Sequence, residues 1–298
     1  MIIAIVVTYE PSFVMLHKVL GALAEQVSDV VVVDNGSRCA NDIKPLVRNF
    51  GALLVALPSN EGIASAQNRG IEIALKAGAS DVLLMDQDTI LHAGAVNALV
   101  ATRRKLADKG IRVGSIGPLY RNSHDGRPST IWRADGRSLV RSDPGYGSGN
   151  WVEADFVIAS GSLLSAETLR VVGTMDEPLF IDLVDLEWGF RAAAMGYRHF
   201  VCCEAQMNHT LGAGQLRFFR RTVTRHAPIR NYYWVRNALT LSRRGYVRCA
   251  WKRYFILQAL RFPVFYSLFA DQKLKRLRLM LVGLTDAIRG RGGSFDRH

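Results

Sequence analysis

The stretch Val82-Leu83-Leu84-Met85-Asp86-Gln87-Asp88 is an apolar run that ends in two acids. Such a run is typical of a strand buried in a parallel sheet, and α/β proteins place ligands at the carboxyl ends of these strands. Asp86 and Asp88 project to the same side of an extended backbone, where their charges repel. A divalent cation relieves this repulsion and can also hold a diphosphate. Solvated acids at a strand end explain an isolated pair equally well, so the rest of the chain decides.

Strands and helices alternate on both sides of this stretch. We predict strands over 2–7, 29–33, 52–57, 81–85 and 112–117, and helices over 12–26, 40–50, 62–77 and 93–109. This alternation predicts an α/β fold with a doubly wound, mostly parallel sheet and right-handed connections.

The second half of the chain is less regular. Residues 120–150 are rich in Gly, Pro, Ser and Asp, which predicts irregular β-structure or a mobile loop. Beyond about residue 215 the pattern is mostly helical. The remaining predicted elements are strands over 152–158 and 198–203 and helices over 165–171 and 185–195.

The positive charge of the chain is concentrated in its last third. Residues 217–298 hold 19 of the 38 lysines and arginines but three of the 26 acidic residues. Aromatic residues are interleaved with them, so this tail suits an anionic membrane surface. A basic face that packs on its own domain is the alternative, and no recognised nucleic-acid motif supports a nucleic-acid partner. Segment 254–270 contains Arg261 and Pro263 and is too short for a comfortable membrane span.

Length and cysteine usage also limit the possibilities. With 298 residues and 49% hydrophobic composition, the chain suits one large α/β domain, or one domain with an appendage. Its four cysteines form no C-x-x-C pair, which indicates reduced thiols and a cytoplasmic location. Residues 1–7 lack a basic region and a cleavage site, so we interpret them as a first strand and not as a signal peptide.

Polar residues also follow the other predicted strands. Thr8 and Tyr9 end the first strand, and Asp34-Asn35-Gly36-Ser37 ends the second. Asp34 can accept a hydrogen bond from a nucleotide base and Tyr9 can stack on one, although the segment also has the composition of an ordinary turn.

The segment 60–70 begins the helix that precedes the acid pair. Small residues at 62, 64, 66 and 70 allow a close approach to a strand or a ligand, and Asn68 and Arg69 can bind hydroxyl or phosphate oxygens. Tight helix–sheet packing is the alternative for the alanines. No G-x-G-x-x-G follows the first strand, which counts against a nicotinamide dehydrogenase.

Taken in order, these motifs resemble a family-2 glycosyltransferase of GT-A fold over roughly residues 1–240. The Asp-Gln-Asp form at 86–88 and the Ile-Asp-x-Val-Asp-x-Glu-Trp form at 181–188 are similar to those of bacterial rhamnosyltransferases. Such enzymes use dTDP-L-rhamnose to build O-antigen or related polysaccharide. The segments that carry the resemblance are 8–9, 33–37, 60–70, 86–88, 161–162, 180–191, 208–212 and 230–237.

The resemblance implies a donor site and a metal site. Asp34 would contact the nucleotide base, and Asp88 would bind Mg²⁺ or Mn²⁺ on the diphosphate. Asp86 would contact sugar or ribose or serve as a second ligand. His209 would be a third metal or phosphate contact, or else structural. The other donor-binding candidates are Thr8, Tyr9, Asn35, Asn60, Gly62, Asn68 and Gln87.

The resemblance also implies a catalytic base in a later acidic motif. Counting back from Arg191 places it at Asp185, although Val184 stands where many relatives have Glu, so Asp182 stays an alternative. Acids also favour a helix N-terminus on their own account. The expected acceptor residues are Gly161, Ser162, Glu187 and Trp188, of which Trp188 is equally suited to core burial. Arg230 and Arg236 would reach phosphates or acceptor, or form a solvated basic face.

We therefore expect a metal-dependent inverting glycosyltransferase that transfers rhamnose from dTDP-L-rhamnose to a glycan or lipid-linked glycan, in the cytoplasm or at the inner face of the cell membrane. We expect a GT-A domain over 1–215 and a helical basic extension over 216–298. The alternatives are a UDP-sugar donor, a sugar nucleotidyltransferase and a non-catalytic basic binding protein. Thr8-Tyr9-Glu10-Pro11 lacks the Gly-rich, basic signature of a nucleotidyltransferase.

Overall fold

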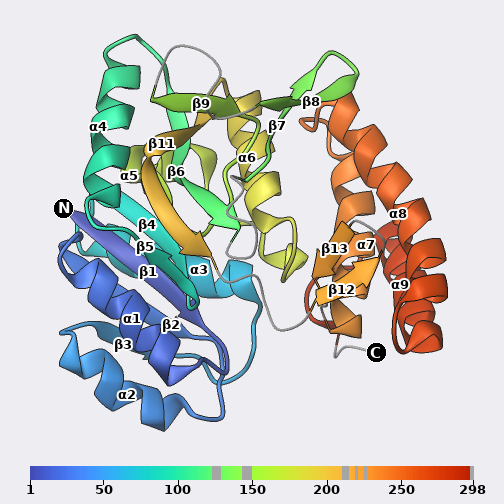
Figure 1. Cartoon of the computed structure of the whole chain (residues 1–298), viewed down its shortest axis with the longest axis horizontal. Helices are drawn as coiled ribbons and strands as arrows, with labels where there is room; N and C mark the ends of the chain where they lie inside the picture. The colour runs from blue at the N-terminus through green and yellow to red at the C-terminus, as the bar shows by residue number, and fades with distance from the viewer. Residues whose placement is uncertain (123–128, 143–149, 210–214, 219–220, 225–226, 296–298) are drawn as a thin grey trace.

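The structure, a computed structural model, describes residues 1–122, 129–142, 150–209, 215–218, 221–224 and 227–295. Figure 1 shows a twisted central sheet with helices on both faces and a group of helices from the end of the chain to one side. The strands are β1 (Ile2–Thr8), β2 (Asp29–Asp34), β3 (Leu53–Ala56), β4 (Asp81–Asp86), β5 (Thr89–Leu91), β6 (Val113–Asn122), β7 (Ile131–Asp135), β8 (Ser138–Ser142), β9 (Trp151–Ala154), β10 (Ser162–Ser165), β11 (Arg198–His209), β12 (Gln215–Phe218) and β13 (Arg221–Thr224).

The helices alternate with the first strands and then dominate the end of the chain. They are α1 (Phe13–Ala24), α2 (Ala40–Asn49), α3 (Ile63–Lys76), α4 (Ala95–Ala107), α5 (Ala166–Val172), the 3-10 turn η1 (Glu177–Leu179), α6 (Val184–Ala194), α7 (Pro228–Arg243), α8 (Cys249–Phe269) and α9 (Lys273–Arg289).

The central sheet is mixed, with a parallel half at the amino-terminal end. Within the described residues its order is β3-β2-β1-β4-β10-β6-β11-β5, and β9 pairs with β11. The pairs β1–β2, β1–β4, β2–β3 and β6–β11 are parallel. Strand β10 is antiparallel to both of its neighbours. The predicted doubly wound α/β sheet is confirmed, and the antiparallel strand inserted beside β4 is a feature that we did not predict.

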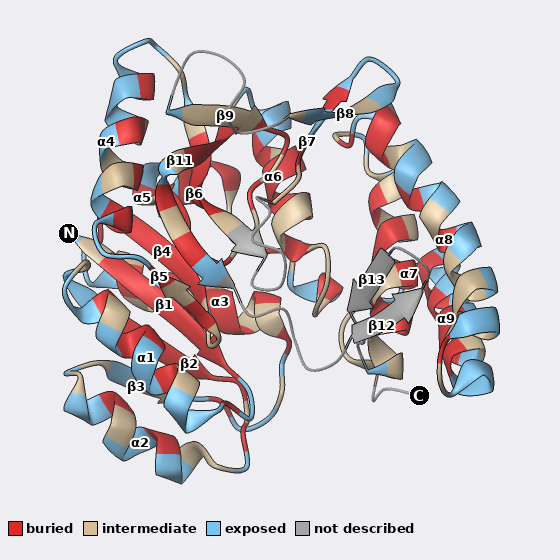
Figure 2. Ribbon diagram, in the orientation of Figure 1, coloured by how far each residue is buried: buried red, intermediate tan, exposed pale blue. Residues whose placement is uncertain are grey.

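Side chains of each central strand alternate between two apolar layers. Ile3, Ile5 and Val7 of β1 belong to a cluster with α3 and α6, whereas Ala4 and Val6 belong to a cluster with α1, α2 and α4. Figure 2 shows these strands as almost continuously buried. Because both faces are covered, the strands read as unbroken apolar runs and not as alternating ones.

The predicted elements before residue 118 are present with small shifts at their ends. Two short strands, β5 and β10, were missed, and β6 and β11 are longer than predicted. In the segment 120–150, β7 and β8 form a hairpin, and residues 123–128 and 143–149 lie outside the described residues. The helical tail is confirmed from residue 228 onward, but the hairpin of β12 and β13 precedes it.

The three terminal helices are joined to the sheet domain through shared apolar packing. Trp251 and Phe255 of α8 lie in the same core cluster as Trp188 and Phe190 of α6. The ring centroids of Phe190 and Trp251 are 5.4 Å apart. The division at residue 215 therefore stays a prediction. No helix in the described part of the chain is both long and apolar enough to cross a membrane.

Candidate functional site

The parallel register brings the predicted strand-end residues to one edge of the sheet. Thr8 of β1 pairs in register with Asp34 of β2, and Val7 pairs with Asp86 of β4. In open α/β sheets this edge is where ligands bind. The structure therefore brings Thr8, Asp34 and Asp86 to the same edge, and their roles in a site stay predictions.

Asp34 is completely buried and its carboxylate is occupied within the protein. Its Oδ1 accepts hydrogen bonds from Thr8 Oγ1 at 2.9 Å and from Ser37 Oγ at 2.6 Å. Its Oδ2 accepts from the Ser37 backbone N–H at 2.9 Å. These bonds hold the ends of β1 and β2 together. The expected contact of Asp34 with a nucleotide base stays a prediction.

Asn35 and Asn60 link the loops after β2 and β3. Asn35 Nδ2 donates to Asn60 Oδ1 at 3.1 Å, and Asn35 Oδ1 accepts from the Glu61 N–H at 2.9 Å. The Gly62 N–H also donates to Asn60 Oδ1, at 3.0 Å. The two asparagines thus shape the entrance to α3 and need no ligand to do so.

Gly62 allows this entrance to touch a distant loop. Its φ is +90°, and a Cβ there would lie 2.6 Å from a ring carbon of Phe180. The next residue, Ile63, donates its backbone N–H to the Phe180 carbonyl at 2.7 Å. Only glycine fits such a conformation and such an approach without strain, so the sequence signal at Gly62 reflects close packing.

Gln87, between the two acids, holds the end of β4 against the end of β1. Its Oε1 accepts from the Tyr9 N–H at 2.8 Å and its Nε2 donates to the Tyr9 carbonyl at 3.2 Å. The Tyr9 side chain is exposed. Gln87 therefore positions the neighbouring aspartates, and the Tyr9 ring has the accessibility that stacking on a base would require.

Asp185, in the first turn of α6, lies near Asp86 although it is remote in sequence. Its Oδ1 accepts from the Leu186 N–H at 2.9 Å, and its Oδ2 from the Ala159 N–H at 3.3 Å. Burial, with a further contribution from the charge of Asp86, raises the pKa of Asp185 to about 6, against the opposing effect of these bonds. A carboxylate with such a pKa is ionised at neutral pH and is more basic than an ordinary aspartate.

Asp182, the alternative base, is paired with a cation. It forms a two-point ion pair with Arg230 of α7, in which Nε donates to Oδ2 at 3.2 Å and Nη2 donates to Oδ1. Burial lowers the pKa of Arg230, but the pairing with Asp182 and the charge of Asp86 outweigh this effect and raise it. The Arg230 guanidinium thus contacts both carboxylate oxygens of Asp182, whereas backbone N–H groups donate to the carboxylate oxygens of Asp185.

The loop before Asp185 has an unusual backbone. Phe180, Asp182 and Leu183 have φ values of 63°, 66° and 64°. Non-glycine residues rarely adopt this region, and such strain clusters at functional sites.

Helix α7 holds this loop in place with two buried side chains. Asn237 Nδ2 is shared between the carbonyls of Leu179, Ile181 and Asp182 at 2.8–2.9 Å. Arg236, which is 1% exposed, donates to the carbonyls at Pro178, Leu179 and Gly293. The expected phosphate contact of Arg236 does not fit this position, because its guanidinium is enclosed and bound to main-chain oxygens.

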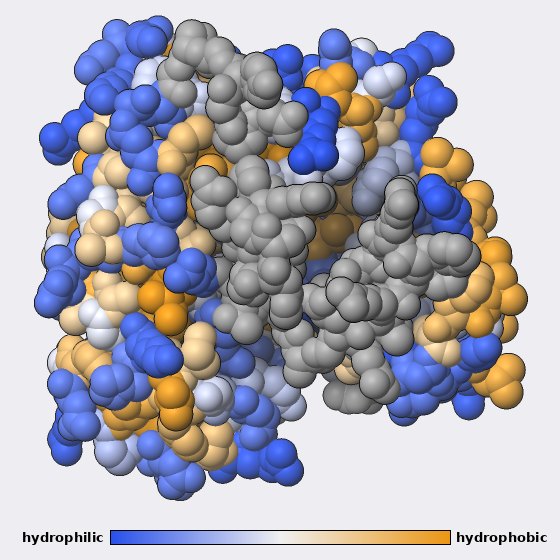
Figure 3. Space-filling view, in the orientation of Figure 1, coloured by the Kyte–Doolittle hydropathy of each residue, from blue (hydrophilic) through white to orange (hydrophobic). Residues whose placement is uncertain are grey.

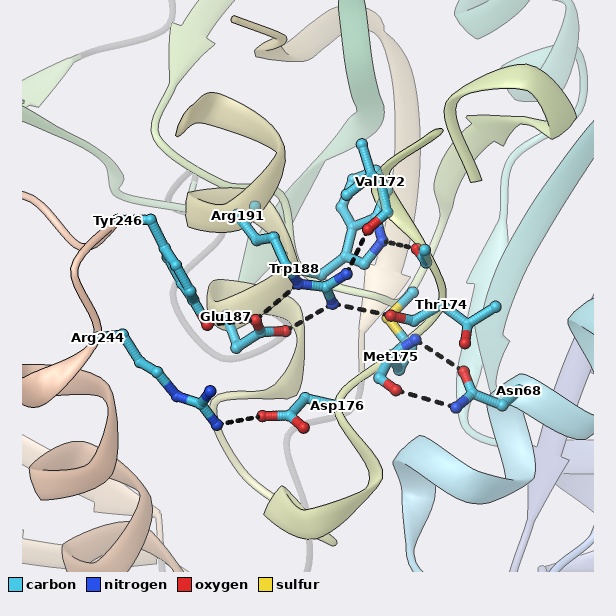
Figure 4. Close-up of polar contacts among 12 residues, drawn as sticks. Asn68, Val172, Thr174, Met175, Asp176, Glu187, Trp188, Arg191, Arg244 and Tyr246 are labelled. Carbon is cyan, nitrogen blue, oxygen red and sulfur yellow. Dashed lines mark hydrogen bonds and ion pairs between the residues drawn. The ribbon is translucent and has the colours of Figure 1, made fainter. Parts of the chain in front are cut away.

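Three other predicted site residues have internal partners (Figure 4). Glu187 is buried, forms a two-point pair with Arg191 at 2.8 Å and accepts from Tyr246 Oη at 2.6 Å. Trp188 is buried and donates from Nε1 to the Gly173 carbonyl at 2.8 Å. The expected direct contacts of Glu187 and Trp188 with an acceptor do not fit this burial. Asn68 binds the backbone of Met175 through both its amide atoms, which likewise does not fit the expected ligand contact.

Gly161 and Ser162 lie beside β4, close to the acid pair. The Gly161 N–H donates to the Leu84 carbonyl at 2.8 Å, and Ser162 is buried in β10. The neighbouring Ser160 Oγ accepts from the Asp86 N–H at 3.4 Å. The antiparallel strand β10 thus borders the site, and the acceptor role of this segment stays a prediction.

The residues at the end of β4 fit a divalent cation in type and charge. Asp86 and Asp88 supply carboxylate oxygen, which Mg²⁺ and Mn²⁺ prefer, and the charge of Asp86 contributes to the raised pKa of Asp185. Among the side chains that the structure describes, no three His, Cys, Asp or Glu converge on a metal position. The side chain of His209 lies outside the described residues, as do Thr210, Leu211 and Gly212.

A cavity of about 590 Å³ opens beside the entrance to α3. Its described lining includes Asn60, Glu61, Phe180 and residues 290–294 near the end of the chain, but not Asp86, Asp88 or Asp185. The three aspartates therefore do not line this cavity. A carboxylate with a raised pKa, such as Asp185, can deprotonate a hydroxyl. A cation such as Arg230 can stabilise an anionic leaving group.

Sequence comparison gives a family match and a full-length relative. Residues 3–148 match the family model described as Glycosyl transferase family 2. The chain is 29% identical over 301 residues to the dTDP-rhamnosyl transferase RfbF of Shigella flexneri, with 99% of this chain and 98% of that protein covered.

Solved glycosyltransferase structures share the fold. A GalNAc-T7 structure with UDP, GalNAc and Mn²⁺ has a TM-score of 0.56 at 11% identity, and the match covers 89% of this chain and 57% of that one. A structure of residues 1–349 of S. aureus TarS with UDP-GlcNAc has a TM-score of 0.61 at 16% identity, with 97% and 81% covered. The predicted GT-A-type fold is confirmed.

Proposed function

We propose that this chain is a family-2 glycosyltransferase that transfers L-rhamnose from dTDP-L-rhamnose to a glycan, since residues 3–148 match the model of that family. The observation that carries the donor assignment is the 29% identity to a dTDP-rhamnosyl transferase over nearly the full length of both proteins. The acid cluster at the end of β4 and at the start of α6 supports the chemistry.

We assign the catalytic base to Asp185. Its carboxylate takes the proton of an acceptor hydroxyl while that oxygen forms a bond to the anomeric carbon of the sugar. The bond from the anomeric carbon to the diphosphate breaks in the same displacement, its electron pair leaves with the diphosphate, and the configuration is inverted. The pKa of about 6 supports this role because the group is ionised at neutral pH yet retains affinity for a proton.

The leaving diphosphate requires positive charge. Asp88 and Asp86, with His209 as a third candidate, would hold Mg²⁺ or Mn²⁺, which would neutralise charge on the phosphate oxygens. Arg230 stays the candidate phosphate contact, and in this structure its guanidinium is paired with Asp182 and interacts with the charge of Asp86. Gln87 keeps the two aspartates oriented through its contact with the Tyr9 backbone.

We propose that the acceptor is a glycan on a polyprenyl-type lipid and that the protein works at the inner face of the cell membrane. The basic residues of the C-terminal third support this location, since the cytoplasmic leaflet is anionic.

A donor panel tests the proposal directly. Thermal unfolding would be followed with dTDP-rhamnose, UDP-GlcNAc and other UDP-hexoses, each with and without Mg²⁺ or Mn²⁺. We expect dTDP-rhamnose with metal to raise the melting temperature more than either alone. Asp88→Asn should remove the metal-dependent part of the shift, whereas Asp108→Asn, an exposed acid at the end of α4, should leave it unchanged.

The other results of this panel contradict specific parts of the proposal. A shift with UDP-hexoses alone would replace rhamnose by the second candidate donor class, which the UDP-GlcNAc complex of the structural neighbour favours. A metal-independent shift would remove the metal role. No shift with any nucleotide sugar would remove the proposed donor assignment.

A further inference from the structure

Helix α8 exposes a continuous apolar stripe. Leu257, Leu260, Val264 and Leu268 are spaced by three, four and four residues, so they lie on one face of the helix. All four are more than half exposed, Leu260 at 67%. The opposite face, with Trp251 and Phe255, is buried against the sheet domain. The helix is therefore apolar on two sides, of which the fold covers one.

Helix α9 carries a second stripe of the same kind. Leu274, Leu281, Leu284 and Ile288 are exposed, Leu274 at 83%, and their spacing of seven, three and four residues places them on one face. The other face packs on α7, where Gly283 meets the Tyr232 carbonyl. Figures 1 and 3 show α8 and α9 side by side at one edge of the molecule, where hydrophobic surface gathers. We call the eight stripe residues of the two helices the apolar edge.

The charges around the apolar edge are all of one sign. Its exposed charged neighbours on α8 and α9 are basic: Arg253, Arg261, Lys273, Lys275, Arg278 and Arg289. Over 249–289, all of which the structure describes, the acids are Asp271 and Asp286. Asp271 is paired with Arg276 at 2.8 Å, and Asp286 is buried and accepts from Tyr232 Oη. Within 249–289, both acids are therefore engaged by partners in the chain, and the exposed charged side chains are all basic.

This combination selects one partner. Contiguous exposed apolar surface marks an interaction site, and the ring of cations requires that the partner be anionic. A second copy of the chain would bring the same cations against one another, which is unfavourable. An anionic bilayer supplies both an apolar interior for leucine side chains and phosphate charge for lysine and arginine.

We propose that the apolar edge docks on an anionic lipid bilayer, with α8 and α9 lying in the plane of the interface. The eight stripe residues enter the acyl boundary and the flanking cations contact the headgroups. This inference deepens the proposed function, because it specifies the surface by which the enzyme reaches a lipid-linked acceptor. It needs neither donor nor acceptor to be tested.

Vesicle sedimentation of the full-length protein provides the test. We expect binding to phosphatidylglycerol–phosphatidylcholine vesicles, weak binding to pure phosphatidylcholine, and loss of binding as salt rises from about 0.1 to about 1 M, where the screening length falls to about 3 Å. Leu260→Ser with Leu274→Ser should weaken the partition coefficient by about tenfold or more, because each leucine loses several buried CH₂ equivalents. The combined variant Arg253→Gln, Arg261→Gln, Lys275→Gln and Arg278→Gln should bind anionic and neutral vesicles equally.

Matched variants elsewhere separate this surface from general hydrophobicity and charge. The double variant Leu53→Ser with Val171→Ser removes two exposed apolar residues, one in β3 and one in α5. A second control removes four exposed cations by the changes Lys18→Gln, Lys44→Gln, Arg104→Gln and Lys105→Gln. Both sets should bind vesicles like the parent protein. Circular dichroism and the donor-induced thermal shift should be unchanged in all variants, so loss of docking is distinguishable from loss of the proposed function.

Three results would overturn the proposal. They are equal binding to neutral and anionic vesicles, no vesicle binding by the parent protein, and sedimentation equilibrium showing a dimer that Leu260→Ser with Leu274→Ser dissociates. Preferential binding to a nucleic-acid duplex, measured as a competitor of the vesicles, would also contradict it.

Discussion

The charge of Asp86, in the first half of the chain, contributes to the raised pKa of Asp185, in the second half. Asp185 lies in the first turn of α6 and Asp86 ends β4, and burial together with the charge of Asp86 raises the pKa of Asp185 to about 6. The proposed base and one of the candidate metal ligands therefore interact electrostatically.

The activity should fall as pH decreases through about 6, because a protonated Asp185 cannot accept a proton. Asp185→Asn should lower kcat/KM by about 10²- to 10⁴-fold, the usual contribution of general base catalysis, and leave the donor-induced thermal shift in place. The measurement is a pH profile of kcat/KM for both proteins. An Asn variant that kept the activity and the acidic limb would exclude Asp185 as the base.

The free energy of unfolding should also depend on pH through the raised pKa of Asp185. The folded-state pKa lies above the ordinary value of 3.8, so the folded protein holds the proton more tightly than the unfolded chain. The contribution of protonated Asp185 to the free energy of unfolding is fully present below about pH 4 and is lost as pH rises through about 6. A rise of the pKa from 3.8 to about 6 corresponds to at most about 3 kcal/mol in the free energy of unfolding. Urea unfolding at several pH values should show this dependence in the parent protein, and Asp185→Asn should reduce it.

Asp182→Asn separates the two candidate bases. Since Asp182 is paired with Arg230, we expect this variant to lose some activity through altered positioning while its acidic limb stays near pH 6. The comparison of pH profiles decides between the candidates. Loss of the acidic limb in Asp182→Asn, with a normal limb in Asp185→Asn, would reverse the assignment.

Asn237→Leu should loosen the strained loop before α6. The substitution leaves the carbonyls of Leu179, Ile181 and Asp182 without their shared donor, which should cost about 1–3 kcal/mol. Activity should fall together with stability. Thr240→Val on the same helix removes only a bond to the Arg236 carbonyl and serves as the control. Equal denaturant midpoints for the two variants would show that Asn237 does not hold the loop.

Arg191→Met should be among the most destabilising single changes near the site. Glu187 is buried and Arg191 is its ionic partner, so the variant leaves an uncompensated charge at a cost of about 3–5 kcal/mol. Arg69→Met breaks an exposed pair with Glu72 and should change the unfolding midpoint little. Similar midpoints for the two variants would mean that Tyr246 alone compensates the Glu187 charge.

Much of the fold followed from local pattern. The apolar runs of β1, β2 and β4, and the helices between them, predicted a parallel half-sheet whose strand ends meet at one edge, and Thr8, Asp34 and Asp86 lie there. The short strands β5 and β10 escaped prediction because three or four residues carry no distinguishable period. Their pairing is determined by neighbours that are distant in the chain.

Side-chain roles divide in the same way. The sequence by itself determined which residues are acidic, amide or basic, and the strand ends where several of them gather. Only the tertiary structure decided that Arg236, Glu187, Trp188 and Asn68 face internal partners whereas Asp185 faces Asp86. The physical reason is that a polar side chain has the same chemistry whether it binds a ligand or a buried carbonyl, and the difference lies in the groups that folding brings within hydrogen-bond distance.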